Sequence, residues 1–376
     1  MAQKDVNYID FTWNWLLYNS RFFCIIIMGE VMKSIFDFTY EKLISFLIDN
    51  GFKKYNADQI IDWVYNKRVY DFNKMSNLSK SLISFLESNF TFDFIEIVKE
   101  EKDIDTSKYL FKLNDGNYIE AVLMKHNYGV SLCVSSQVGC NMGCSFCESG
   151  RLKKVRDLTV SEMVMQVILI EDKLGKKINN LVLMGIGEPF DNYDNVMDFV
   201  RILTNNKMIN LGQRKITIST CGIVPKIKEF MNEKLQVNLA ISLHAAFDET
   251  RNKLMKINKV YPLKDLIKVI DEYIEKTGRR VTIEYIMLDK VNDRDIDAEN
   301  LVKLFKNKLI YINLIPYNNV ESFTYKKSKK SQILKFYDIL KKGNINVTIR
   351  REFGSNVSAA CGQLRGRACK EGESCL

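Results

Sequence analysis

Residues 131–147 read SLCVSSQVGCNMGCSFC. The first five residues are mostly apolar or β-forming and are typical of a buried strand over 131–135. The loop that follows carries Cys140, Cys144 and Cys147 in a C-x3-C-x2-C spacing. In proteins built from parallel strands, functional residues follow the carboxyl ends of the strands. The stretch therefore predicts the first unit of an α/β domain, with a functional loop at its end.

Strand and helix patterns alternate through the rest of the chain. Amphipathic stretches over 159–174 and 263–276 are long enough for helices, and Thr159-x-x-Glu162 is a capping-box signature at the start of the first. Six strand–helix units imply a parallel sheet, which is either a partial or full barrel or an open doubly wound sheet. The further strands are expected over 180–184, 215–219, 237–242, 280–288 and 310–315, with a last β run over 346–350.

The segments before the first strand differ in pattern. Apolar residues recur at helical spacings from 32 to about 89, and an Asn-Asp-Gly turn at 114–116 separates two β-rich runs. The apolar run 22–28 is far shorter than the roughly 20 residues of a membrane-spanning helix, so no membrane span is expected. We predict an upstream extension (1–31, or else an amphipathic surface helix), a helical accessory domain (32–100), a β-hairpin linker (101–130), a barrel (131–345) and a C-terminal segment (346–376).

Composition limits the class of protein. The 376 residues include 46% hydrophobic and 27% charged residues, as in an ordinary globular protein. A net charge of +9 suits a polyanionic partner such as RNA, and equally a basic protein without one. Nine cysteines, an odd number, do not suit a full set of disulfides. We expect a reducing, cytoplasmic location.

The three clustered cysteines have three interpretations. Three thiolates in one loop can ligate three irons of a [4Fe–4S] cluster and leave the fourth iron open to a small molecule. The alternatives are a zinc site, which usually needs four ligands, and three core residues on one helix face. Gly139 and Gly143 argue against a helix, and the spacing favours the cluster.

The run resembles the signature of radical S-adenosylmethionine (SAM) enzymes. Together with MGIGEP (184–189), SLH (242–244) and AACGQL (359–364), it resembles the RlmN/Cfr family of ribosomal RNA adenine methyltransferases from about residue 32 to 367. The resemblance implies a partial (β/α)6 radical-SAM barrel, a [4Fe–4S] cluster on the three cysteines, and SAM. It places cofactor contacts on Gly187, Glu188, Ser219, Ser242, Leu243, His244 and Asn318.

The resemblance also implies a ping-pong reaction that uses two SAM molecules per turnover. One SAM methylates Cys361, and radical cleavage of the second activates that methyl group for addition to adenine. Cys133 then resolves the covalent protein–RNA adduct by forming a disulfide with Cys361, and Glu120 accepts a proton. From the residues alone, Cys133 reads as a buried strand residue and Glu120 as a surface charge.

The target follows from the same resemblance. We expect C2 of adenine 2503 in 23S rRNA, with adenine 37 of tRNA as a further substrate; C8 methylation of the same rRNA adenine, which confers antibiotic resistance, is the alternative. Flavodoxin or ferredoxin is the expected electron donor, and a monomer the expected state. Glu148-Ser149 departs from the small residues usual after the third cysteine. A radical SAM enzyme acting on a small molecule or peptide is the alternative from another class.

Overall fold

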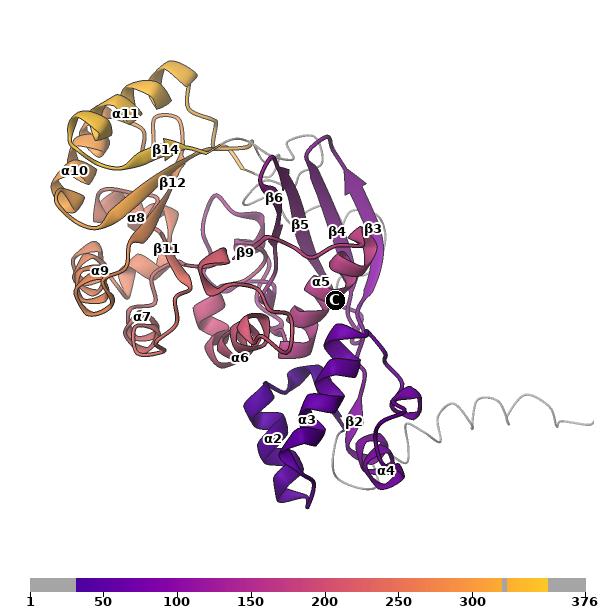
Figure 1. Cartoon of the computed structure of the whole chain (residues 1–376). Helices are drawn as coiled ribbons and strands as arrows, with labels where there is room; N and C mark the ends of the chain where they lie inside the picture. The colour runs from indigo at the N-terminus through magenta and orange to yellow at the C-terminus, as the bar shows by residue number, and fades with distance from the viewer. Residues whose placement is uncertain (1–31, 320–322, 351–376) are drawn as a thin grey trace, which may run out of the picture.

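The computed structural model describes residues 32–319 and 323–350 of the chain. Its centre is a ten-stranded sheet with the order β14-β13-β12-β11-β10-β9-β6-β5-β4-β3 (Figure 1). Two short pairs, β1 with β2 and β7 with β8, lie outside it. The strands are β1 Lys33–Ser34, β2 Phe90–Thr91, β3 Glu96–Lys102, β4 Thr106–Lys112, β5 Tyr118–His126, β6 Gly129–Cys133, β7 Gln137–Val138, β8 Arg156–Asp157, β9 Asn180–Leu183, β10 Ile216–Thr220, β11 Asn238–Ser242, β12 Val281–Met287, β13 Ile310–Pro316 and β14 Val347–Ile349.

The parallel part of the sheet runs from β6 through β9 to β14. From β6 to β14 these strands lie in the sheet in the same order as in the chain. Because the crossovers between parallel strands are right-handed, the connecting helices then lie on one face of the sheet. The α/β partial barrel is confirmed, whereas the doubly wound alternative is wrong because that sheet needs a reversal of strand order. The helices are α2 Tyr40–Asp49, α3 Lys54–Ile61, α4 Lys80–Asn89, α5 Val160–Leu174, α6 Tyr193–Thr204, α7 Val224–Phe230, α8 Asp248–Leu254, α9 Leu263–Thr277, α10 Asp295–Phe305 and α11 Lys330–Lys342.

The predicted helix start at Thr159 is confirmed in detail. The Thr159 hydroxyl accepts from the backbone N–H of Glu162 (3.2 Å), and the Glu162 carboxylate accepts from the backbone N–H of Thr159 (3.0 Å). Gly175 ends the helix in the left-handed conformation that glycine adopts without strain. Gln166 of α5 exchanges hydrogen bonds with the backbone N–H (2.9 Å) and carbonyl (3.1 Å) of Ser135, so the helix holds the segment that leads into the cysteine loop.

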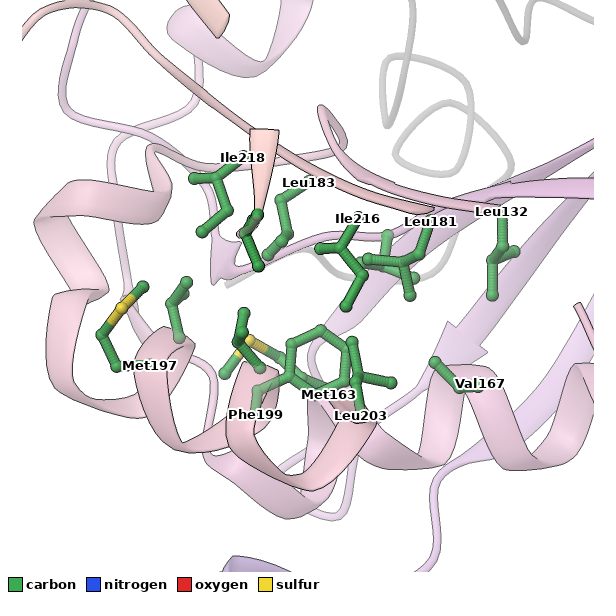
Figure 2. Close-up of a cluster of buried hydrophobic side chains, with 14 of the residues drawn as sticks. Leu132, Met163, Val167, Leu181, Leu183, Met197, Phe199, Leu203, Ile216 and Ile218 are labelled. Atoms are coloured by element: carbon green, nitrogen blue, oxygen red, sulfur yellow. The ribbon is translucent and has the colours of Figure 1, made fainter. Parts of the chain in front are cut away.

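The main core lies between the parallel strands and helices α5 and α6. Alternate residues of β9 and β10 point toward these helices, as the two-residue period of a strand requires. Figure 2 shows buried apolar side chains meeting across this layer, namely Leu132, Leu181, Leu183, Ile216 and Ile218 from the strands and Met163, Val167, Met197, Phe199 and Leu203 from the helices.

The predicted hairpin forms around the Asn-Asp-Gly turn, where Gly116 has a φ of 83°. With β3 it makes an antiparallel edge that continues the parallel sheet, because β5 pairs with β6 at Val122 and Cys133. Residues 96–126 are therefore joined to the barrel by backbone hydrogen bonds along whole strands. This arrangement brings side chains of the hairpin next to the first barrel strand.

The N-terminal helices α2, α3 and α4 gather at one end of the sheet (Figure 1). Ion pairs attach them to the barrel helices and their loops: Arg68 to Glu171 (2.7 Å) and Lys207 to Asp58 (2.6 Å). Asp37 also accepts a hydrogen bond from the backbone N–H of Ser161 (2.7 Å). None of the helices within the described ranges is long and apolar enough to span a membrane.

Candidate active site

A cavity opens at the carboxyl ends of strands β9 to β13, beneath the cysteine loop. Most of the predicted site residues line it, although they come from segments more than 100 residues apart in the sequence. Among the predicted residues, the lining includes Cys140, Cys144, Cys147, Gly187, Glu188, Ser219, Ser242 and His244.

The cysteine loop is not helical, so the interpretation of three residues on a helix face is wrong. Gly139 and Gly143 have φ values of 75° and 60°, which a regular helix does not allow. The Ser145 backbone N–H donates to the Leu254 carbonyl (2.9 Å), which holds the loop against the segment after α8. The loop thus covers the cavity and directs its cysteines toward it.

The three thiols form a donor set suited to a metal cluster. Burial raises the pKa of the Cys140 thiol to about 12; burial and the neighbouring Cys147 and Cys140 thiols raise the pKa of Cys144 well above its usual value. Three adjacent thiolates therefore need strong cationic compensation, which metal binding supplies with release of protons. Among the described residues, no group of three or more His, Cys, Asp or Glu side chains is placed so that it could hold a metal ion as it stands.

Gly187 and Glu188 form the wall that follows β9. A side chain on Gly187, whose φ is 110°, would meet the Gln137 Cβ at 2.7 Å and the Ser136 hydroxyl at 2.8 Å. Glu188 is buried, and its two oxygens accept from the backbone N–H groups of Phe190 (3.0 Å) and Cys221 (2.7 Å). Burial raises the pKa of Glu188, and the two backbone donors fix its orientation. The Thr220 hydroxyl and the Cys221 thiol also hydrogen-bond to the Glu188 carboxylate.

His244 follows β11 with a φ of 57° and is buried. Its Nδ1 accepts from the Ile286 backbone N–H (3.1 Å), and its ring meets Phe146 edge-on at 5.0 Å. Burial lowers the pKa of His244 to about 3. At neutral pH the ring is therefore uncharged with its proton on Nε2, which suits a hydrogen-bond donor in a ligand pocket rather than an acid or base.

The buried neutral state of His244 makes folding sensitive to acid. Because the folded pKa lies below the ordinary value of 6.5, stability falls as the pH drops below about 6.5. At pH 5 we expect the loss to be about 2 kcal/mol relative to neutral pH. His244→Gln should remove this component in urea unfolding, whereas a substitution of His126, the other histidine of the chain, should leave it in place. Equal pH dependence of the wild type and His244→Gln would contradict the assignment.

Two predicted cofactor residues are not among those that line the cavity. The Leu243 side chain belongs to the core on the helical face, and Asn318 follows β13 near the rim. The backbone of Leu243 is held by Arg251, a fully buried residue that the sequence did not predict. The Arg251 guanidinium donates to the carbonyls of Leu243 (3.0 Å) and Cys221 (2.7 Å), so it ties the loops after β10 and β11 together.

Cys221, to which the sequence assigns no role, lines the cavity. Its backbone N–H orients Glu188, and its carbonyl accepts from Arg251. The signal was present in the sequence, since Cys221 is two residues beyond the carboxyl end of the predicted strand 215–219. Burial and the nearby Glu188 carboxylate raise the pKa of its thiol well above the ordinary value.

Glu120 and Cys133 lie on neighbouring strands of the antiparallel edge. Val122 pairs with Cys133, and Glu120 is two residues from Val122, so all three share one face. Cys133 packs with Met184, which lines the cavity, and this face is therefore continuous with the site. The predictions on Cys361 and on residues 1–31 lie outside the described residues.

Glu120 is buried rather than a surface charge, and a buried lysine compensates it. Lys108 Nζ lies 3.4 Å from a Glu120 oxygen and 2.9 Å from a Glu101 oxygen. Only 5% of the lysine side chain is exposed, against 23% for Glu101. The three residues form a charged row from the interior to the surface, on strands β5, β4 and β3.

Several basic residues near the site form ion pairs with acidic residues of the protein itself. Arg156 binds Asp115 (2.6 Å) and both oxygens of Glu162 (2.8 Å each), and Lys154 lies 2.8 to 2.9 Å from two aspartates. These two cations therefore contribute less to phosphate binding than their sequence positions suggest. Arg151 faces the buried Glu148 at 3.6 Å, which compensates the unusual carboxylate after the third cysteine.

Comparison with known proteins agrees with this geometry. Residues 134–302 match the model of the Radical SAM superfamily. The partial barrel with its cysteine loop is thus that of a radical SAM enzyme, a class that implies a [4Fe–4S] cluster and SAM. Residues 33–91 match the ribosomal RNA large subunit methyltransferase N-terminal domain.

Individual relatives show which family of radical SAM enzymes the chain resembles. A probable dual-specificity RNA methyltransferase RlmN of Enterococcus faecalis is 51% identical over 348 residues, which cover 90% of this chain and 98% of that one. A Streptococcus thermophilus protein with the same description is 50% identical over 353 residues, covering 91% and 90%. The crystal structure of a radical SAM methyltransferase from Sphaerobacter thermophilus has a TM-score of 0.83 at 40% identity, covering 89% and 99%. The chain belongs to the RlmN family.

Proposed function

We propose that this enzyme transfers a methyl group to C2 of adenine 2503 in 23S rRNA, and also to adenine 37 of tRNA. The observation that carries the proposal is the placement of three thiols over a cavity whose wall continues into the face that holds Glu120 and Cys133. A cluster suits the thiols, and an acceptor carboxylate and a second thiol suit the later steps. Relatives with about 50% identity are described as dual-specificity RNA methyltransferases.

Each residue has a role in this proposal. When bound, the cluster and SAM supply radical chemistry, which an unreactive aromatic carbon requires. Cys361 carries the methyl group that is transferred. The Cys133 thiolate attacks the Cys361 sulfur, so that the S–S bond forms while the bond between that sulfur and the product carbon breaks. The electron pair of the broken bond stays with the product, whose released carbon takes up a proton and becomes the methyl group. The Glu120 carboxylate accepts the proton that leaves the methylated carbon, and Lys108 holds that carboxylate in place.

The partners follow from the same chemistry. Methylating a base requires that it be turned out of its stack, which suits recognition of RNA by shape. The N-terminal helices, attached to the barrel through α5 and α6, supply a second surface for that RNA. We further propose that each turnover uses two SAM molecules and that a flavodoxin or ferredoxin is the reductant. The enzyme is proposed to be a cytoplasmic monomer.

The test is anaerobic reconstitution, followed by incubation with SAM, a reductant and unmodified 23S rRNA fragments or tRNA. Mass spectrometry of the nucleosides should show 2-methyladenine in both RNAs, and Cys361→Ala should yield none. 8-Methyladenine would instead support the resistance-type activity. Methyl transfer retained by Cys361→Ala, or no methylated adenine at all, would overturn the proposal and favour a small-molecule or peptide substrate.

A further inference from the structure

A buried carboxyl group in the cavity has no role in the proposal so far. Glu284 lies on β12, is 4% exposed and lines the cavity. One of its oxygens accepts from the Asn313 side-chain amide (3.0 Å). The other, Oε2, is buried and has no hydrogen-bond partner in the described part of the chain. Buried polar atoms are nearly always paired, so this oxygen indicates a missing donor.

Glu284 belongs to a polar row that crosses the inner face of the barrel. Ser242 pairs with Glu284 and Glu284 with Asn313 in the strand register. The hydroxyls of Ser219 and Ser242 are 3.4 Å apart, which extends the row to β10. Polar side chains in consecutive strands at one level of a barrel interior are costly without a polar ligand. The row therefore forms a built surface for a ligand with several hydroxyl or amino groups.

The neighbours of the polar row indicate which part of a ligand would contact it. Ile286 and Ile315 are two residues further along β12 and β13 and line the same cavity, so an apolar layer suited to a flat ring lies above the row. Glu188 follows β9, three strand spacings or roughly 14 Å along the sheet from β12. The two carboxyl groups thus bind different parts of an elongated ligand.

We propose that Glu284 Oε2 accepts a hydrogen bond from a ribose hydroxyl of the adenosyl ligand; this inference rests on the cofactor of the proposed function. Of the donors that SAM carries, the ammonium group suits Glu188, and the adenine ring suits the apolar layer. The ribose hydroxyls remain for Glu284. Acidic side chains at the ends of parallel strands bind ribose hydroxyls in dinucleotide-binding folds for the same chemical reason.

The experiment measures binding rather than turnover. Anaerobically reconstituted full-length wild type and Glu284→Ala are titrated with S-adenosylhomocysteine and with its 2′-deoxy and 3′-deoxy ribose analogues. We expect Glu284→Ala to weaken binding of S-adenosylhomocysteine about tenfold or more, as for a hydrogen bond to a charged group. For one of the two deoxy analogues, the wild type and the variant should bind equally well.

The controls separate this role from folding and from other contacts. Glu284→Gln keeps the volume of the side chain, and Glu171→Gln removes a buried carboxylate remote from the cavity and should not change ligand affinity. Equal loss for all three ligands would overturn the inference. Glu284 would then act through its charge interaction with Arg350, which also lines the cavity. A loss seen with SAM but not with S-adenosylhomocysteine would place Glu284 at the sulfonium and also overturn it. If the wild type bound none of these ligands, the proposed function itself would fail.

Discussion

Cys144→Ala is expected to abolish assembly of the iron–sulfur cluster and every activity that depends on it. Cys144 is the middle residue of the three, and its loop is fixed to the segment after α8 at the next residue, Ser145. The loop therefore cannot easily move another thiol into its place. With two thiolates left, a cubane has too few protein ligands to be retained. Iron and sulfide content after anaerobic reconstitution should fall to nearly zero, together with the visible absorption of the cluster.

Cys221→Ala is the matched control, because Cys221 is also buried and lines the same cavity. Alanine keeps its backbone contacts with Glu188 and Arg251 and removes only the hydrogen bond between the thiol and Glu188. Cys221→Ala should therefore bind iron and sulfide at the wild-type level. A Cys144→Ala protein with full iron content, or a Cys221→Ala protein without it, would show that the ligands have been misassigned. Zinc in place of iron in the wild type would show that the assignment of an iron–sulfur cluster is wrong.

The elements of the barrel could be predicted because every strand buries apolar residues against the helices, as alternate residues of β9 and β13 do. These short β-rich runs, separated by amphipathic stretches, gave strand positions within about two residues, as for 180–184 against Asn180–Leu183. The choice between a barrel and a doubly wound sheet could not be made from the same pattern. That choice depends on which strands are neighbours in the sheet, and it was decided by the strand order of the structure.

The site was predictable where its residues follow strands or share a motif. The three cysteines, Glu188 and His244 were proposed in this way, and the structure brings them to one cavity. Lys108, Arg251 and Glu284 were not, because their roles arise from burial and from strand register. A shift of one residue in register would place Lys108 on the opposite face of the sheet, away from Glu120. In the sequence it is one of many lysines.

Lys108→Met is expected to lower the free energy of unfolding by about 3 kcal/mol, because removing one partner of a buried ion pair leaves the other charge without compensation. In the proposed reaction, where Glu120 accepts the proton, the variant should also stall after adduct formation. A buried carboxyl group without its cation prefers the neutral form, in which Glu120 cannot accept a proton. Urea unfolding measures the first effect, and accumulation of a covalent protein–RNA species on denaturing gels measures the second.

One further variant and a change of pH separate the effect of charge from the effect of packing. Lys108→Met combined with Glu120→Gln removes both charges, so the double variant should recover most of the lost stability while methyl transfer stays absent. In Lys108→Met alone, raising the pH should partly restore product formation, since the ionised form of Glu120 is then regained. A double variant no more stable than Lys108→Met would show that the lysine acts through packing of its aliphatic stem. Product formation unchanged in Lys108→Met would show that the Glu120 carboxylate needs no buried cation to accept the proton.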